Sequence, residues 1–176
     1  MMKPLLLAAL LAATTAQACP DYLNQELREL ATTTRHNLCQ LTEGKVVLVV
    51  NTASYCGYTK QFADLERLHR QYGAKGLVVL GFPSNDFRQE DGSEQKAADV
   101  CRRDYGVTFP MFNFSHVRGA EANSLFKALA AQSKAPDWNF NKYLLGRDGK
   151  LIARYGAGQT PDRNPLLRQL EQALGQ

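Results

Sequence analysis

The sequence predicts an α/β fold in which helices flank a central mixed β-sheet. Residues 45–51 and 76–82 are apolar runs rich in β-branched residues, and a stretch with helical periodicity separates them. Two further apolar runs, at 142–145 and 151–155, flank the turn residues Gly146-Arg147-Asp148-Gly149. A strand–helix–strand unit favours a parallel pair and a tight turn joins antiparallel strands, so we expect both directions in one sheet.

The first strand is expected over residues 45–51 (KVVLVVN), where continuous apolar character is typical of a strand buried on both faces. From Thr59 onward, apolar residues recur every three or four positions with charged residues between them. This spacing predicts an amphipathic helix that ends near Gly73 or Gly76. The apolar positions of that helix are Phe62, Leu65, Leu68 and Tyr72.

The run GLVVLGF at 76–82 predicts the second strand, and turn residues follow it. A second helix is expected from Ser93 to about Tyr105, because serine is a favoured N-cap residue. A short strand is expected at 111–114 and a further helix at 121–131.

The last part of the chain predicts a β-hairpin and a helix. The pair Asp148-Gly149 lies between the strands expected at 142–145 and 151–155, and Asp-Gly is a strong hairpin signal. The final helix has Pro161 early and a leucine stripe that ends at Leu174. A parallel unit followed by an antiparallel hairpin and a helix is the element order of a thioredoxin-like fold.

The first residues have the pattern of a secretory signal peptide. A positive charge at Lys3 precedes an apolar run at 5–13, and small residues follow up to Ala18. We expect cleavage after Ala18, export to the periplasm, and a single domain over residues 19–176. The apolar run is shorter than the roughly 20 residues that span a bilayer, so no membrane span is expected.

Charge and composition exclude several functions. The chain has 21 Lys and Arg against 17 Asp and Glu, and removing Lys3 with the signal leaves 20 − 17, a net charge of +3. Such a mild excess without a basic run gives no reason to expect nucleic-acid binding. There is no Cys-x-x-Cys, and the three histidines lack ligand spacing, so no metal or other cofactor is expected.

Cys56 is the candidate catalytic residue. It lies in NTASYCGYT (51–59), between the end of a buried strand and the start of a helix, which is where α/β sheets bind ligands. A helix N-terminus stabilises a thiolate through its free N–H groups. The surrounding Gly, Tyr and Thr residues indicate a tight exposed turn; the alternative is a buried, inert cysteine.

Several blocks of residues resemble the glutathione peroxidase family in its cysteine-based form. The first contains Asn-Thr-Ala-Ser-x-Cys-Gly, the second is LGFPSNDFRQEDG, and the third is WNFNKYLL. Each block alone is weak, but their order and spacing are specific. The blocks lie at 44–58, 80–92 and 138–145, with FPMF at 109–112 and DGK at 148–150.

The resemblance implies a hydroperoxide reductase. The Cys56 thiolate would attack the O–O bond, release water or an alcohol, and become a sulfenic acid. Negative charge develops on the departing oxygen, so uncharged hydrogen-bond donors are needed there. The family's donors fall on Gln89, Trp138 and Asn139, whose amide and indole N–H groups suit this task.

The sequence departs from the family pattern in the loop before Gln89. Family members have two residues between Phe and Gln, whereas Arg88 alone separates Phe87 from Gln89, so the loop must absorb a one-residue deletion. Ser84 stands where a cysteine is usual, which leaves fewer candidate partners for the catalytic thiol. Asp86 adds an acid that either faces the site or faces solvent.

The other cysteines are assigned by position. Cys101 precedes the Phe-Pro-x-Phe block on a helix, where thiol-dependent family members carry the resolving cysteine that forms a disulfide with Cys56; the alternative is a buried apolar role. Cys19 and Cys39 bracket the start of the exported chain and are expected to form a structural disulfide.

The resemblance also bears on partners. The region 120–137 lacks the insertion of tetrameric, glutathione-preferring members, so the chain resembles the monomeric, thioredoxin-using type. We expect a hydroperoxide substrate and a thiol reductant, either an exported thioredoxin-like protein or glutathione. Two alternatives are a disulfide oxidoreductase, which the lack of a second cysteine in 56–59 disfavours, and a peroxide-sensing switch.

Overall fold

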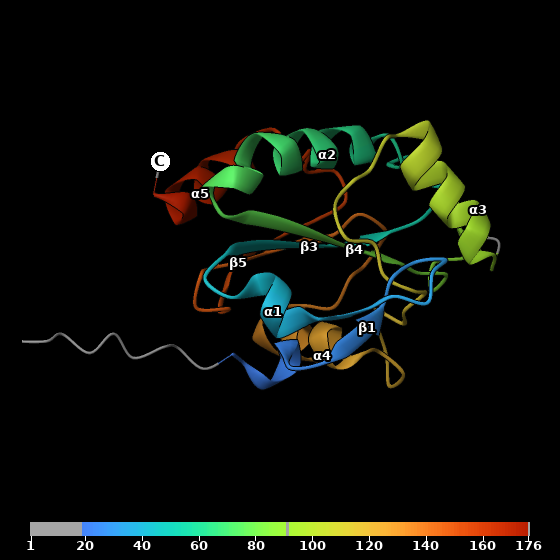
Figure 1. The fold of residues 1–176 in the computed structure, drawn as a ribbon, viewed down its shortest axis with the longest axis horizontal. Coiled ribbons are helices and arrows are strands. Elements are labelled where there is room, and N and C mark those ends of the chain that lie inside the picture. Colours follow the sequence, from blue (N-terminus) through green and yellow to red (C-terminus); the bar gives the residue numbers. More distant parts are fainter. Residues whose placement is uncertain (1–18, 91, 176) are drawn as a thin grey trace, which may run out of the picture.

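The structure is a computed structural model that describes residues 19–90 and 92–175. The expected signal peptide at 1–18 therefore lies outside the described residues. A four-stranded sheet in the order β4-β3-β5-β6 forms the middle layer, with helices on both faces (Figure 1). The strands are β3 (Val46–Thr52), β4 (Leu77–Pro83), β5 (Lys142–Leu145) and β6 (Leu151–Tyr155).

The strand directions confirm the expected mixed sheet. β3 pairs in parallel with β4 and antiparallel with β5, and β5 pairs antiparallel with β6. All seven residues of β3 and of β4 are buried. The continuous apolar runs therefore predicted β3 and β4 for the right physical reason.

Helices cover both faces of the sheet (Figure 1). One face carries α2 (Gln61–Tyr72) and α5 (Leu166–Leu174). The opposite face carries α1 (Leu38–Thr42) and α4 (Ser124–Gln132). The sheet is therefore the middle layer between two separate apolar cores.

The central strand β3 contributes side chains to both cores, because successive strand residues point to opposite faces of a sheet. Val46, Leu48 and Val50 lie in the core beneath α2 and α5. Val47 and Val49 lie in the core toward α1 and α4. This alternation explains why the strand is apolar throughout rather than at every second position.

The predicted helix after Ser93 is present, but it changes type half-way. Ser93 caps α3 (Glu94–Ala98), where its Oγ accepts the Lys96 N–H at 3.3 Å. The chain then continues as a π-helix, η3 (Asp99–Asp104). A π-helical turn has wider hydrogen-bond spacing than an α-helix and often occurs at functional sites. Cys101 lies within it.

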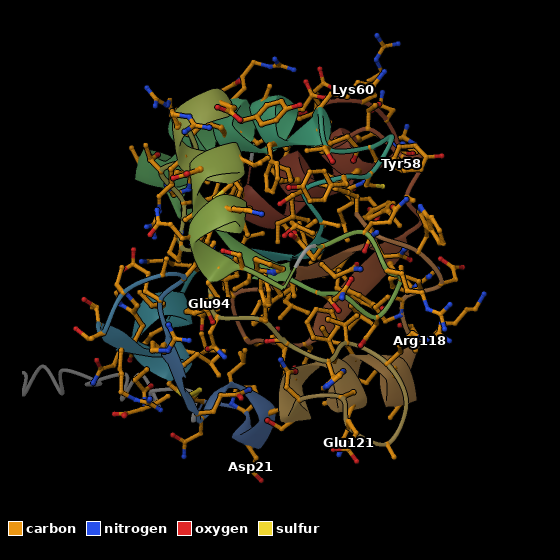
Figure 2. All side chains as sticks on the ribbon, turned by 90° about the vertical axis from the view of Figure 1, so that its right-hand side faces the viewer. Asp21, Tyr58, Lys60, Glu94, Arg118 and Glu121 are labelled. Atoms are coloured by element: carbon orange, nitrogen blue, oxygen red, sulfur yellow. A yellow bond between two sulfur atoms is a disulfide. The ribbon has the colours of Figure 1, made fainter. Side chains whose placement is uncertain are left out.

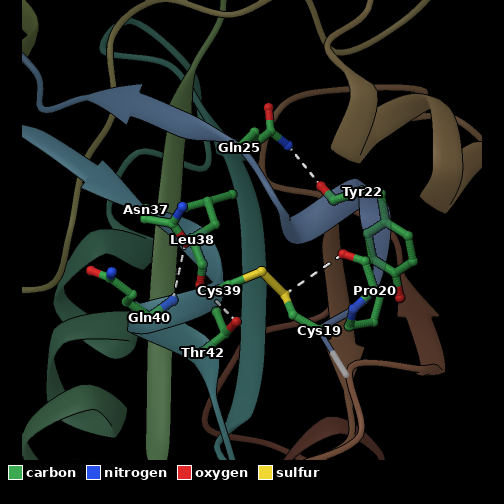
Figure 3. Close-up of a disulfide and its surroundings, with 9 residues drawn as sticks. All are labelled: Cys19, Pro20, Tyr22, Gln25, Asn37, Leu38, Cys39, Gln40 and Thr42. Atoms are coloured by element: carbon green, nitrogen blue, oxygen red, sulfur yellow. Dashed lines mark hydrogen bonds between the residues drawn. A yellow bond between two sulfur atoms is a disulfide. The ribbon is translucent and has the colours of Figure 1, made fainter. Parts of the chain in front are cut away.

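The N-terminal part contains elements that the sequence did not predict. A short helix, η1 (Asp21–Leu23), precedes a hairpin of β1 (Glu26–Arg28) and β2 (Arg35–Asn37). A disulfide joins Cys19 to Cys39 in α1, with 5.8 Å between the Cα atoms (Figure 3). The expected pair is therefore the one found, and it ties the first described residues to α1.

Two sequence-based predictions about elements are wrong. Residues 111–114 do not form a strand: Met111 and Phe112 make only isolated bridges, to Gly81 and Glu29. The last helix begins at Leu166, not near Pro161, and Pro165 is its N-cap residue. The segment before it is a series of turns, because two prolines within five residues interrupt helical hydrogen bonding.

The remaining boundaries agree closely with the predictions. α2 ends at Tyr72 and is followed by the short helix η2 (Gly73–Lys75), after which Gly76 adopts a left-handed φ of 100°.

Within residues 19–90 and 92–175, no helix has the length and apolar character needed to cross a membrane.

Candidate active site

Cys56 lies in a turn between the end of β3 and the first residue of α2. Thr59 holds this turn closed: its Oγ1 accepts the Cys56 N–H at 3.0 Å and donates to the Ala53 carbonyl at 2.9 Å. The Thr59 N–H also donates to the Cys56 carbonyl at 3.0 Å. The position of the thiol is therefore determined by the backbone of the turn and by one threonine.

The Cys56 sulfur is more covered than the sequence indicated. The residue is 8% exposed, whereas the neighbouring Tyr55 is 57% exposed, so the turn faces solvent while Cys56 packs inward. The Tyr58 N–H donates to the sulfur at 3.4 Å. The turn therefore supplies a backbone hydrogen-bond donor to the Cys56 sulfur.

Gln89 connects the Cys56 turn to the segment that carries Asn139. The Gln89 carbonyl accepts the Tyr55 N–H at 3.1 Å. Its side-chain Oε1 accepts a hydrogen bond from Nδ2 of Asn139 at 3.0 Å. Two of the three donors expected from the family resemblance are thus joined to each other and to the turn of the candidate nucleophile.

Trp138 is positioned by two asparagines that the sequence analysis did not single out. Nδ2 of Asn51 donates to the Trp138 carbonyl at 3.0 Å, and Nδ2 of Asn141 donates to the same carbonyl at 2.8 Å. The Trp138 residue is 40% exposed and its ring centroid lies 5.4 Å from that of Phe87. The sequence offered one signal for Asn51: it is a polar residue near the end of the otherwise apolar, buried strand β3.

Asn139 carries an acceptor without a partner. The residue is fully buried, and within the described part of the chain its Oδ1 has no hydrogen-bond partner. Buried polar atoms are rarely left unpaired, so this acceptor, next in sequence to Trp138, is a candidate contact for a hydrogen-bond donor.

The shortened loop contains a residue with a left-handed backbone conformation, Arg88, and a buried acid, Glu90. Arg88 has a φ of 57°, and its N–H donates to the Asn85 carbonyl at 2.9 Å. Glu90 then points inward, where its Oε1 accepts the Ser54 N–H at 2.7 Å and the Ser54 hydroxyl at 2.9 Å. The deletion is therefore absorbed at Arg88, and Gln89 remains beside the Cys56 turn.

Asp86 does not point toward the thiol. Its carboxylate accepts the N–H groups of Val117 at 2.7 Å and Arg118 at 3.2 Å. It also pairs with Nδ1 of His116 at 2.7 Å. Asp86 therefore ties two loops together and is not one of the groups around Cys56.

Cys101 is a free thiol, as is Cys56, and both belong to the same apolar core cluster. Cys101 is fully buried in η3, and its Sγ donates to the Ala98 carbonyl at 3.5 Å. Burial raises the pKa of this thiol to about 11, because the apolar surroundings disfavour the thiolate. In this conformation Cys101 is shielded from solvent.

The surface around the site combines aromatic and cationic side chains. Figure 2 shows Tyr58 and Lys60 on the same side of the molecule as Arg118. The Arg118 guanidinium lies 5.1 Å from the ring centroid of Phe87, which itself contacts Trp138. Aromatic rings therefore line this side of the site, with positive charge beside them.

The fold and the site together define a thiol-based redox protein with a thioredoxin-like fold. A family model described as glutathione peroxidase matches residues 19–130. The chain belongs to the glutathione peroxidase family.

Curated relatives support the same assignment. A glutathione peroxidase-like peroxiredoxin of Chlamydomonas reinhardtii is 46% identical over 125 residues, which cover 68% of this chain and 77% of the relative. A hydroperoxy fatty acid reductase of Synechocystis is also 46% identical, over 132 residues, with 68% of this chain and 78% of the relative covered.

Solved structures confirm the fold. The structure of T. cruzi GPX1 matches with a TM-score of 0.68 at 27% identity, covering 88% of this chain and 96% of that one. A thiol:disulfide interchange protein from Chlorobium tepidum matches with a TM-score of 0.67 at 12% identity, covering 86% and 93%. The second likeness concerns the fold alone.

Proposed function

We propose that this chain is a thiol-dependent hydroperoxide reductase with Cys56 as its nucleophile. The observation that carries the proposal is the meeting of three segments at the turn that contains Cys56. Gln89 bonds to the Cys56 turn through its carbonyl and to Asn139 through its side chain. Family membership then supplies the class of reaction.

The oxidation step follows from this arrangement. The Cys56 thiolate attacks one peroxide oxygen, an S–O bond forms and the O–O bond breaks. The negative charge leaves on the second oxygen, which takes a proton and departs as water or an alcohol. Gln89, Trp138 and Asn139 stabilise that charge or hold the peroxide, since each offers uncharged polar groups.

Cys101 is proposed as the resolving residue. Its sulfur attacks the Cys56 sulfenic acid, an S–S bond forms and water leaves. Cys101 is fully buried, so the η3 segment must move before the two sulfurs reach bonding distance. An external thiol reductant then returns the disulfide to two thiols by exchange.

Two substitutions test the proposal. Cys56→Ser is expected to abolish peroxide consumption, and Cys101→Ser is expected to permit one turnover that leaves a sulfenic acid on Cys56. Multi-turnover activity of Cys101→Ser with a thioredoxin-like donor would remove Cys101 from the resolving role. Repeated turnover by the unsubstituted protein separates an enzyme from a sensor, which would be oxidised only once.

Location, assembly and substrate are further parts of the proposal. The N-terminal sequence pattern supports export to the periplasm after removal of residues 1–18, with the protein acting there as a monomer. Its electrons would come from an exported thioredoxin-like protein or from glutathione. Two relatives are named hydroperoxy fatty acid reductases, and the aromatic rings beside the site suit an organic hydroperoxide.

A further inference from the structure

The hairpin of β5 and β6 carries two charged side chains that turn inward on opposite faces. Lys142 is fully buried, and its Nζ donates to the carbonyls of Gln159 at 2.7 Å and Ala157 at 3.3 Å. Arg154 lies opposite Tyr143 of β5, and its side chain is only 16% exposed. Arginine is seldom buried unless its charge is paired, so the partners of Arg154 indicate what it does.

The partners of the Arg154 guanidinium lie in residues 135–141, the segment that carries two of the candidate site residues. Its Nη2 lies 2.9 Å from Oδ1 of Asp137 and donates to the Ala135 carbonyl at 3.3 Å. It also donates to Oδ1 of Asn141. One guanidinium therefore holds the segment on both sides of those two site residues.

The contact with Asn141 determines how that side-chain amide is oriented. Arginine has only donors, so Oδ1 of Asn141 must face it and Nδ2 is left for another partner. Nδ2 donates to the Trp138 carbonyl at 2.8 Å. Asn51 supports the same arrangement, because its Oδ1 accepts the Asn141 N–H at 3.0 Å and its Nδ2 donates to the Trp138 carbonyl at 3.0 Å. Two asparagines and one arginine therefore hold the backbone at Trp138.

The segment needs such support because Phe140 has a left-handed backbone conformation. Its φ of 59° is unfavourable for a residue with a Cβ atom, and such a residue persists only where the surrounding structure holds it. The preceding residue is Asn139, whose Nδ2 donates to Oε1 of Gln89 at 3.0 Å. The contacts from β6 therefore bear on the position of Asn139 as well as Trp138.

We infer that Arg154 is a positioning residue that holds Trp138 and Asn139 in the geometry that the oxidation step requires. The inference rests on the proposed function, since it concerns the donors of that site. Arg154 acts through Asn141 and Asp137 and takes no part in bond making or proton transfer. Without it, Oδ1 of Asn141 loses its donor, and the amide is free to turn away from the Trp138 carbonyl.

Trp138 is the only tryptophan in the sequence, so its fluorescence reports this segment directly. Arg154→Met removes the charge and the donors but keeps an unbranched side chain. Arg168→Met is the matched control, because Arg168 is exposed on α5. We expect Arg154→Met to raise acrylamide quenching of Trp138 and to lower its fluorescence anisotropy, whereas the control keeps the values of the unsubstituted protein. Unchanged quenching and anisotropy in folded Arg154→Met protein would overturn the inference.

A double-mutant cycle tests whether Arg154 acts through Trp138. The rate of Cys56 oxidation by cumene hydroperoxide is followed by quenched-flow mass spectrometry. We expect Arg154→Met to slow oxidation about tenfold, as the loss of hydrogen bonds from a charged group would. In Trp138→Phe protein the same substitution should slow it less than about threefold, because coupled residues are not additive. Equal slowing in both backgrounds would overturn the inference, since a general loss of packing acts whatever residue stands at 138.

Asp137→Asn keeps the test decisive if Arg154→Met does not fold. The Asp137 side chain is half-exposed, and the substitution weakens one contact with Arg154. Lys134→Met is its control, because it removes the other ion pair of Asp137, with Lys134 at 3.1 Å. We expect stronger quenching of Trp138 in Asp137→Asn than in Lys134→Met, and equal quenching in the two variants would overturn the inference.

The fluorescence measurements need no peroxide and no turnover. A chain that consumes no peroxide would contradict the proposed function. Normal peroxide consumption together with a Trp138 signal that does not respond to Arg154→Met would overturn the inference alone.

Discussion

Thr59 makes the strongest local contribution to the geometry of the Cys56 turn. Its hydroxyl accepts the Cys56 N–H and donates to the Ala53 carbonyl. Thr59→Val keeps the shape but removes both bonds, and we expect the rate of Cys56 oxidation to fall about tenfold, as a loss of about 1.4 kcal/mol would produce. Thr59→Ser retains the hydroxyl and serves as the control in rapid-mixing measurements with peroxide; equal rates for both variants would contradict this role.

Arg88 has an unfavourable backbone conformation in the shortened loop. Its φ of 57° lies in the left-handed region, which costs a non-glycine residue about 1 kcal/mol. Arg88→Gly is expected to raise the free energy of unfolding by up to about 1 kcal/mol, whereas Arg88→Ala should give no gain. Denaturant titration of both variants checks this, and a destabilised Arg88→Gly protein would show that the loop is not strained.

At the residue scale, the sequence could predict the groups that belong to a continuous pattern. Cys56, Gln89 and Asn139 stand in recognisable blocks, and the structure brings their segments together. It could not predict Glu90 or Lys142 as inward-pointing charges. Their positions depend on a loop deletion and on the packing of a turn that lies elsewhere in the sequence.

At the scale of elements, ion pairs attach the Cys101 helix to the N-terminal hairpin. Arg102 of η3 pairs with Glu29 at 2.6 Å. Arg102→Leu is expected to loosen η3 and to speed alkylation of Cys101 up to about fivefold in a Cys56→Ser background, since such pairs contribute about 1 kcal/mol at most. Arg103→Leu is the control, because the ion pairs of Arg103 are with Asp99 and Asp104 of its own helix. Equal alkylation rates in the two variants would contradict the prediction.

The buried state of Cys101 also gives a pH prediction. Its pKa is raised by burial from 9.0 to about 11, so its thiolate fraction keeps increasing above pH 9 while the helix stays folded. In Cys56→Ser protein we expect the alkylation rate to rise about tenfold per pH unit through pH 9. In urea the rate should level off near pH 9, and levelling at the same pH in both states would contradict the prediction.

The elements themselves were predictable where periodicity was strong. β3, β4 and α2 follow directly from continuous apolar runs and from a helical stripe. The change to a π-helix at Asp99 has no such pattern, because it depends on how the segment packs. The β1–β2 hairpin was also missed, since its three-residue strands are too short to show alternation.

At the scale of the whole molecule, the Cys19–Cys39 disulfide and Cys56 lie toward opposite ends of β3. The disulfide lies toward the end where β3 begins, and Cys56 follows the end where β3 stops, so the seven-residue strand places them roughly 20 Å apart. The disulfide closes a segment with a sequence separation of 20 residues. Removing the disulfide should therefore lower the stability of the fold without changing the chemistry at Cys56.

The double substitution Cys19→Ser with Cys39→Ser tests that separation. We expect a loss of about 3 kcal/mol in the free energy of unfolding, because the unfolded chain regains the freedom that the cross-link removed. The rate of Cys56 oxidation, measured well below the melting temperature, should change less than about twofold, since distant sites act independently. A large fall in that rate in folded protein would show that the N-terminal segment influences the active site through the sheet.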